Sequence, residues 1–168
     1  MNLDFASVWE TIADIVPEND ALICGDEVVS WKDYDLDSSK IATALCNAGL
    51  SANSKAGLYL NNSNEYLIAQ NAIFKIGGVP INVNYRYMAE ELIYLLDNSD
   101  SEAVFYHACY SGRIKEIAKK IKFKFDKDDE KRFFKFTEKT NYDIETIEKK
   151  AELVDYVQKT FEVMGLIN

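Results

Sequence analysis

The chain has 168 residues, of which 48% are hydrophobic and 28% are charged, and its formal net charge is −9. This length and composition fit one globular domain with a buried core. The charge is uneven, because residues 1–118 carry 17 acidic and 7 basic side chains whereas residues 119–168 carry 11 and 12. An acidic body offers no electrostatic footprint for nucleic acid, so we expect no nucleic-acid partner.

The sequence contains no apolar run long enough to span a membrane. Its first residues also lack the basic and apolar regions of a signal peptide. We therefore expect a cytoplasmic protein with no transmembrane segment. The three cysteines, Cys24, Cys46 and Cys109, are far apart and lack metal-ligand spacing, so we predict small buried side chains in a reducing compartment.

The N-terminal part predicts a helix, a hairpin and a second helix. Residues 5–16 have apolar side chains at helical spacing, and Pro17 ends this helix because proline disfavours helical geometry in the residue before it. Residues 21–30 have the pattern of two short strands joined by a tight turn. The second helix is predicted to begin after a cap at Ser30 and to end near Gly49.

The next part alternates short apolar strands with amphipathic helices. We predict strands at 56–60, 79–83 and 103–107, and helices at 64–76, 89–98 and 111–121. Such alternation predicts parallel strands joined by right-handed crossovers. The expected fold class is therefore α/β, a partial doubly wound sheet with a βαβαβ core, an N-terminal helix and hairpin, and an α-helical C-terminal tail. Ile73 and Leu95 are predicted to face the sheet.

Residues 122–168 differ from residues 1–121 in composition, and we divide the chain between them. Residues 119–136 mix lysines and phenylalanines with several acids, which predicts a solvated amphipathic segment. Residues 143–166 have apolar side chains about one turn apart, which predicts a long amphipathic helix. This tail is the only material available to cover the open edge that a three-stranded sheet leaves.

One stretch carries a family resemblance. Residues 77–100 read GGVPINVNYRYMAEELIYLLDNSD, with a glycine-rich turn, a strand ending in Asn-x-Arg and a helix containing Glu-Leu-x-Tyr-Leu-Leu-x-x-Ser. This pattern resembles the adenylate-forming superfamily, which holds the AMP-dependent acyl-CoA synthetases and their relatives. The resemblance runs from about Phe5 to about Ile121. It implies that residues 1–121 are the N-terminal part of an adenylate-forming (AMP-binding) domain, followed by an unrecognised helical tail over residues 122–168.

The resemblance implies a ligase of fatty acid metabolism that activates an acid as an acyl-adenylate and then forms a thioester, using ATP, Mg²⁺ and CoA. That family holds ATP with a Ser/Thr/Gly-rich loop that ends in lysine. The nearest string here, Ser111 to Lys115, lacks the glycine pair and the threonines and suits an ordinary helix. The family's later ribose-binding Asp and catalytic Lys have no matching positions either. We therefore expect a truncated synthetase that retains no cofactor and is inactive alone. Two alternatives stay open: a remnant of a broken enzyme, or one part of a split enzyme whose partner is a second polypeptide carrying the rest.

The sequence gives few candidate site residues. We assign no catalytic residue and no metal site. The single histidine, His107, is interpreted as structural, and the acidic run 126–130 as a solvated turn that lacks the glycine and distal Glu of a calcium loop. Arg86 is the candidate cofactor-binding residue, because it follows the carboxyl end of a strand, where open α/β sheets bind ligands. The alternative is that Arg86 pairs with a neighbouring acid such as Glu90.

Two other functions stay open at this point. The first is a stand-alone protein-interaction module built on the same partial fold. The second is a small nucleotide-binding protein that uses the strand ends. The acyl substrate is not defined, because the acyl pocket of the resembled family lies downstream of the region that the resemblance covers.

Overall fold

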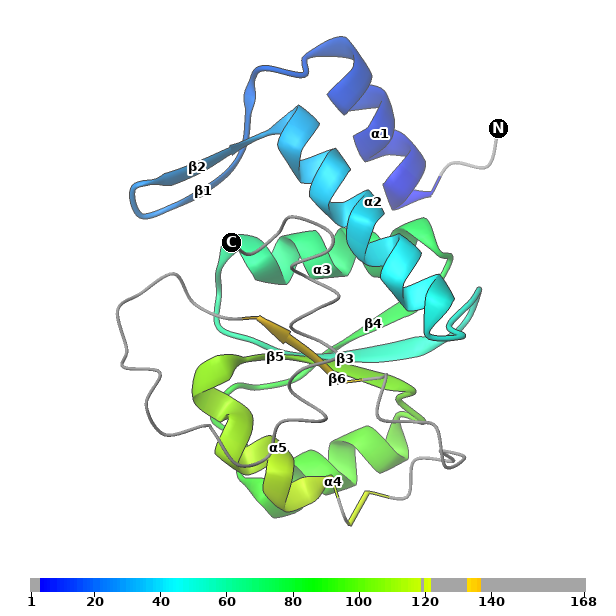
Figure 1. The fold of residues 1–168 in the computed structure, drawn as a ribbon, viewed down its shortest axis with the longest axis vertical. Helices are drawn as coiled ribbons and strands as arrows, with labels where there is room; N and C mark the ends of the chain where they lie inside the picture. Colours follow the sequence, from blue (N-terminus) through cyan, green and yellow to red (C-terminus); the bar gives the residue numbers. More distant parts are fainter. Residues whose placement is uncertain (1–3, 119, 122–132, 137–168) are drawn as a thin grey trace.

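The computed structural model describes residues 4–118, 120–121 and 133–136. Two layers of helices enclose a four-stranded sheet, and a two-stranded hairpin projects from one layer (Figure 1). In chain order the elements are α1 (Phe5–Ile15), β1 (Asp20–Cys24), β2 (Glu27–Ser30), α2 (Trp31–Asn47), β3 (Lys55–Tyr59), α3 (Asn64–Lys75), β4 (Val79–Asn82), α4 (Ala89–Asn98), β5 (Ala103–His107), the 3₁₀ turn η1 (Ala108–Tyr110), α5 (Ser111–Ile117) and β6 (Phe133–Phe136).

The N-terminal helix, hairpin and second helix are confirmed. The Asp4 side chain caps α1 by accepting a hydrogen bond from the Ser7 amide at 2.8 Å, and α1 ends just before Pro17. Strands β1 and β2 pair antiparallel, with Ile23 opposite Val28. The Ser30 hydroxyl caps α2 by accepting from the Asp33 amide at 3.1 Å. Local capping thus positions these elements as the sequence predicts.

The main sheet is wholly parallel, in the order β4-β3-β5-β6. Its central strands β3 and β5 are in register, with Gly57 opposite Val104 and Tyr59 opposite Tyr106. The three predicted strands and the βαβαβ connection are confirmed. Because β3 lies between β4 and β5, the chain reverses its direction of travel across the sheet after β4, and this reversal places the loops after β3 and β5 on neighbouring strands.

The fourth strand is a correction to the sequence analysis. We predicted a solvated amphipathic segment over residues 119–136, but residues 133–136 form β6, which pairs parallel with the outer side of β5. Phe134 is 3% exposed and stacks on Phe105, with their ring centroids 4.8 Å apart. The mixed charges of this segment obscured the strand pattern in the sequence. The strand forms because the unpaired edge of β5 offers it a pairing partner, which local sequence cannot reveal. The predicted tail helix at 143–166 lies outside the described residues.

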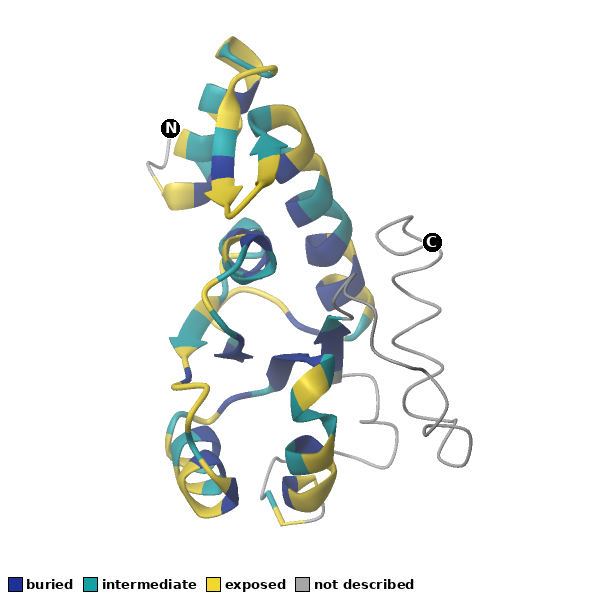
Figure 2. Cartoon of the chain, turned by 90° about the vertical axis from the view of Figure 1, so that its left-hand side faces the viewer, coloured by how far each residue is buried: buried dark blue, intermediate teal, exposed yellow. Residues whose placement is uncertain are grey.

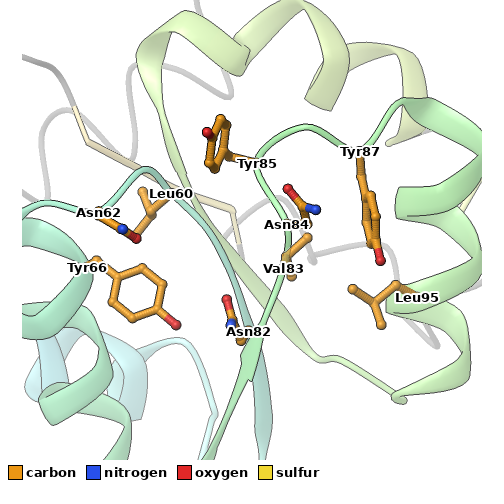
Figure 3. A pocket seen from close by; sticks show the side chains of 9 residues that line it. All are labelled: Leu60, Asn62, Tyr66, Asn82, Val83, Asn84, Tyr85, Tyr87 and Leu95. Atoms are coloured by element: carbon orange, nitrogen blue, oxygen red, sulfur yellow. The ribbon is translucent and has the colours of Figure 1, made fainter.

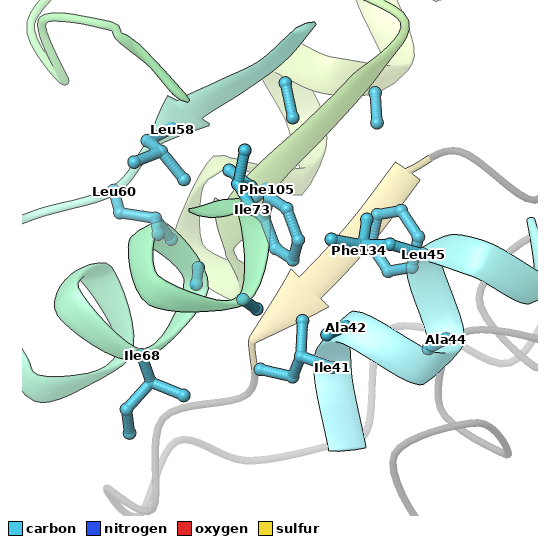
Figure 4. Close-up of a cluster of buried hydrophobic side chains, with 14 of the residues drawn as sticks. Ile41, Ala42, Ala44, Leu45, Leu58, Leu60, Ile68, Ile73, Phe105 and Phe134 are labelled. Carbon is cyan, nitrogen blue, oxygen red and sulfur yellow. The ribbon is translucent and has the colours of Figure 1, made fainter. Parts of the chain in front are cut away.

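Each face of the sheet has its own helix layer and its own core (Figure 1, Figure 2). Helices α2 and α3 lie on one face of the sheet and α1 packs against both of them, and we call this side the α1–α3 face. Its core includes Ile41, Leu45 and Ile73, all fully buried (Figure 4). Helices α4 and α5 cover the other, the α4–α5 face. Here Leu92 and Leu96 are the fully buried leucines of α4, while Leu95 is only partly buried. The prediction is therefore confirmed for Ile73 and shifted by one residue for Leu95.

The glycine-rich turn before β4 has a steric cause. Gly77 adopts a positive φ of 69°, a conformation that side chains disfavour. A Cβ on Gly78 would lie 2.9 Å from the backbone oxygen of Ser54, which is too close for any other residue. The Gly77-Gly78 pair therefore lets α3 end and β4 begin in close contact with the start of β3.

The predicted burial of the three cysteines is wrong. Cys24, Cys46 and Cys109 are all exposed, because they lie in the projecting hairpin, on the last turn of α2 and in η1. Sequence gives the average tendency of a cysteine to be buried, but not which side of an element it occupies. Within the described ranges, no helix combines the length and the apolar character that a membrane span requires.

Candidate ligand-binding pocket

A pocket opens at the carboxyl ends of β3 and β4, with a volume of about 420 Å³. Open parallel sheets bind ligands at this edge because the loops that leave the strands are free to vary there. Side chains from the two strand ends, from the start of α3 and from α4 converge on it (Figure 3). The lining residues are Leu60, Asn62, Tyr66, Asn82, Val83, Asn84, Tyr85, Tyr87 and Leu95.

The lining is polar but uncharged. It supplies three carboxamides and three phenols, with leucine and valine side chains between them. Burial raises the pKa of Tyr66, so its phenol stays protonated and can donate a hydrogen bond at neutral pH. These groups can hold an uncharged, flat or amide-bearing ligand. They include no nucleophile with an adjacent base, and no lysine or arginine that would neutralise a phosphate.

The loop that leaves β4 shapes one wall of the pocket. The Asn84 side-chain oxygen accepts a hydrogen bond from the Arg86 amide at 3.0 Å, which forms a local turn. This turn directs Tyr85 and Tyr87 to the pocket and leaves Arg86 exposed between them. The Arg86 guanidinium lies 5.3 Å from the centre of the Tyr85 ring. Arg86 does not line the pocket, and the described ion pairs do not join it to Glu90.

A second arginine supports the same loop through a hydrogen bond to its backbone. Arg113, in α5, donates from Nη1 to the backbone oxygen of Tyr87 at 2.9 Å and also to the hydroxyl of Tyr59. Its guanidinium lies within 6 Å of the rings of Tyr59 and Tyr110. The Tyr59 hydroxyl in turn donates to the Tyr87 backbone oxygen at 3.0 Å. Arg113 is therefore a positioning residue for the pocket wall.

Sequence reasoning missed Arg113. The string Ser111 to Lys115 does form the ordinary helix that we predicted, α5, but one of its side chains reaches the loops after β3 and β4. The sequence did hold a signal for this role, because Arg113 is the single arginine in the first turn of a helix that follows the end of a strand. The asparagines that line the pocket also had a signal, since Asn62 and Asn84 both follow the carboxyl ends of predicted strands.

His107 is the last residue of β5, which pairs with β3. It is 3% exposed, and its Nδ1 accepts a hydrogen bond from the Asn61 amide at 3.2 Å. The Tyr110 hydroxyl donates to the Asn61 side-chain oxygen at 2.6 Å, and the Tyr59 and Tyr110 rings lie 4.6 Å apart. These contacts join the ends of β3 and β5, and the interpretation of His107 as structural stays a prediction. The pocket lies to one side, between β3 and β4.

The described residues include no group of three or more His, Cys, Asp or Glu side chains arranged to hold a metal ion. The acidic run 126–130, interpreted above as a solvated turn, lies outside the described residues. ATP and Mg²⁺, which the resembled family uses, would need cations and carboxylates that the pocket lining does not provide. The pocket residues therefore do not fit a triphosphate, and no step of a reaction is assigned to them.

The chain is an α/β domain with an uncharged pocket at the carboxyl ends of two of its strands. Comparison with known families places this domain: the family of AMP-binding enzymes matches residues 9–159. The chain belongs to that family. The match runs past residue 121, where the resemblance in the sequence analysis ended, and takes in β6. The division of the chain between residues 121 and 122 stays a prediction.

Comparison with individual proteins gives a consistent result. A medium/long-chain-fatty-acid–CoA/3-oxocholest-4-en-26-oate–CoA ligase from Mycobacterium marinum is 38% identical over 115 residues, which are 68% of this chain and 21% of that protein. The chain thus spans about a fifth of the length of this relative.

Solved structures share the fold. A candidate long-chain-fatty-acid CoA ligase from Rhodopseudomonas palustris superposes with a TM-score of 0.72 at 18% identity, covering 83% of this chain and 34% of that one. A benzoate CoA ligase from Burkholderia xenovorans gives a TM-score of 0.69 at 14% identity, covering 81% of this chain and 26% of that one. At these identities the likeness establishes the fold alone.

Proposed function

We propose that this chain forms the first part of an acyl-CoA ligase, which activates a carboxylic acid as an acyl-adenylate and then transfers the acyl group to the thiol of CoA. The family match and the acyl-CoA ligase activity named for the Mycobacterium marinum relative support this proposal. They favour it over the stand-alone interaction module. A cytoplasmic location is part of the same proposal, since ATP and CoA are metabolites of that compartment.

The observation that carries the proposal is the uncharged pocket at the carboxyl ends of β3 and β4. On this proposal the pocket forms one wall of the ligase cleft and contacts an uncharged part of the substrates, either the acyl group or the amide-bearing arm of the thiol. The carboxamides of Asn62, Asn82 and Asn84 suit the amides of such an arm. Arg86 lies beside this wall with its guanidinium exposed, and we keep it as the proposed cofactor-binding residue for a phosphate of the thiol substrate.

We further propose that the chain is inactive alone and needs a second polypeptide. Its sequence has no Ser/Thr/Gly-rich phosphate loop, and the pocket lining holds no cation. The test is acid-dependent pyrophosphate release by the purified chain with ATP, Mg²⁺ and a panel of carboxylic acids. We expect release at the background rate with every acid. Turnover above background with any acid would show that the chain adenylates by itself.

The second polypeptide is tested by reconstitution. The chain is mixed with the remaining part of the Mycobacterium marinum relative, which begins after the 21% that this chain matches. We expect CoA-dependent acyl-CoA formation from medium- and long-chain acids by the mixture and by neither part alone. A mixture that forms a stable complex but makes no acyl-CoA would contradict the proposed function.

A further inference from the structure

The hairpin of β1 and β2 presents apolar side chains on both of its sides (Figure 1). Leu22 of β1 and Val29 of β2 are paired, and both belong to the core of the α1–α3 face or pack against it. The next pair, Ile23 and Val28, points to the opposite side of the hairpin, because successive residues of a strand alternate between its faces. Ile23 is 68% exposed and Val28 is 53% exposed. We call this pair the outer hairpin face.

The outer hairpin face departs from the usual pattern of a hairpin in water. An antiparallel sheet with one side on a core normally carries polar side chains on its other side. Here that other side carries two β-branched apolar side chains directly opposite each other. Among the described residues, β1 and β2 pair only with each other, so their outer backbone edges are open as well. Open strand edges beside exposed apolar side chains are features by which one protein surface receives another.

The hairpin also contacts the loop that lines the pocket. The Cys24 thiol donates a hydrogen bond to the backbone oxygen of Asn62 at 4.0 Å, and Asn62 is one of the pocket residues. Cys24 directly follows Ile23 in β1, so the outer hairpin face begins one residue away from this contact. A protein part that closes the pocket on this side therefore comes within reach of Ile23 and Val28.

The part of the ligase that this chain lacks is the occupant that fits. The chain matches 21% of the length of the Mycobacterium marinum relative, so most of a ligase of that size has no counterpart here. On the proposed function, the missing part must bring the cations that hold ATP to the pocket, because the pocket lining has none. It therefore approaches the edge of the sheet that the hairpin flanks.

The charges of the hairpin favour this occupant over a second copy of the chain. The two strands and their turn carry Asp20, Asp26 and Glu27 and no basic residue. Residues 1–118 as a whole carry 17 acidic and 7 basic side chains, so a second copy would bring acids against acids. A surface with cations around an apolar centre complements the hairpin instead.

We propose that the outer hairpin face is the surface on which the remaining part of the ligase docks, through a partner surface that is apolar at its centre and basic around it. The choice of occupant rests on the proposed function. The exposure and the pairing of Ile23 and Val28 rest on the structure alone. Docking here would bury the apolar pair and join the partner to the pocket loop through Cys24 and Asn62.

The test measures assembly and not catalysis. The full chain is co-expressed with an affinity-tagged part of the Mycobacterium marinum relative, which begins after the 21% matched here, and the chain retained by the tag is quantified. We expect Ile23→Lys to lower retention about tenfold, because it removes an apolar contact and adds a charge of the partner's sign. Ile23→Glu should lower retention less than Ile23→Lys does. The matched control, Ile15→Lys, changes a residue of α1 that is 72% exposed and should leave retention unchanged.

A conservative variant separates docking from folding. Val28→Thr keeps the shape and the strand preference of the side chain but adds a hydroxyl, so it should lower retention without altering the fold. Urea denaturation of each free variant should match that of the wild-type chain, because these side chains face water there.

Equal retention of the Ile23→Lys and Ile15→Lys chains would overturn the proposal, and so would a wild-type chain that the tagged part does not retain. Self-association of the wild-type chain that Ile23→Lys abolishes would assign the outer hairpin face to a second copy instead. A complex that depends on this face but makes no acyl-CoA would support the docking surface and contradict only the proposed function.

Discussion

The two faces of the sheet differ in the partners that their polar side chains have. The α1–α3 face has the larger apolar core, and its buried lysine, Lys75, joins α3 to α1 and α2 through two carboxylates. The α4–α5 face has a smaller core and holds Arg113, Tyr59 and Lys135, whose polar groups face loop carbonyls, aromatic rings or another lysine. The α1–α3 face thus pairs its buried lysine with acids of neighbouring helices, whereas the α4–α5 face uses Arg113 to position the pocket wall.

The largest expected effect concerns the smaller core, on the α4–α5 face. It tests whether a buried leucine there contributes as much to stability as buried leucines generally do. Leu96 is fully buried on the α4–α5 face and packs so closely on β3 that a Cβ on Gly57 would lie 2.8 Å from its Cδ2 atom. Leu96→Ala should lower the free energy of unfolding by about 2–5 kcal/mol, as truncations of buried leucines do. The control is Leu95→Ala, which removes a partly buried side chain and should cost clearly less. Urea denaturation of the two variants measures both, and equal losses would contradict the placement of α4.

The next effect concerns the paired lysine. Lys75→Met keeps the buried stem but leaves Glu10 and Asp35 without their partner. Both acids are partly exposed and regain water, so we expect a loss of only about 1–2 kcal/mol of unfolding free energy. Lys32→Met, at an exposed lysine whose single ion pair spans 3.7 Å, is the control and should change stability little. A Lys75 variant as stable as the Lys32 variant would show that the ion pairs do not stabilise the α1–α3 face.

Stability at alkaline pH tests whether the buried tyrosine hydroxyls keep their protons in the folded chain. Burial raises the pKa of Tyr106 to about 12 and raises that of Tyr34 as well, from an ordinary value of 10.0. Because the folded state keeps these protons longer than the unfolded state, their contribution is complete below pH 10 and is lost as the pH rises toward 12. Chemical denaturation across this range should show falling stability. Tyr106→Phe should make the fall shallower, and an unchanged slope would contradict the burial of Tyr106.

The smallest effect should come from Lys135, for which no ion pair is found among the described residues. Lys135→Met removes an amine that is costly to bury and breaks no ion pair within that part of the chain, so stability at neutral pH should stay the same or rise slightly. The folded-state pKa of Lys135 is lowered, so the wild-type chain should gain stability as the pH rises through the range below 10.5, and the variant should lose that gain. A clear destabilisation by Lys135→Met would show that Lys135 makes a favourable interaction, against the comparison with Lys75.

The sequence predicted what local pattern determines. The helix cap at Ser30, the Gly77-Gly78 turn and the strand-helix alternation all depend on neighbouring residues, and the structure confirms them. It did not predict what the fold brings together from a distance. β6 depends on the open edge of β5, and the reach of Arg113 depends on how α5 packs beside the strand ends. The exact face of α4 was also missed, because Leu95 and Leu96 are equally apolar and only packing separates them.

If the pocket at the strand ends contacts a substrate of the ligase, then filling the pocket should stop the reaction. Asn82 lines the pocket and is exposed, so Asn82→Trp should fill the cavity without disturbing either core. Asn47→Trp, at an exposed asparagine on the last turn of α2, is the matched control. The measurement is the rate of acyl-CoA formation by the reconstituted enzyme. We expect a severe loss of this rate with Asn82→Trp and an unchanged rate with Asn47→Trp, whereas equal rates would show that the pocket takes no part in the reaction.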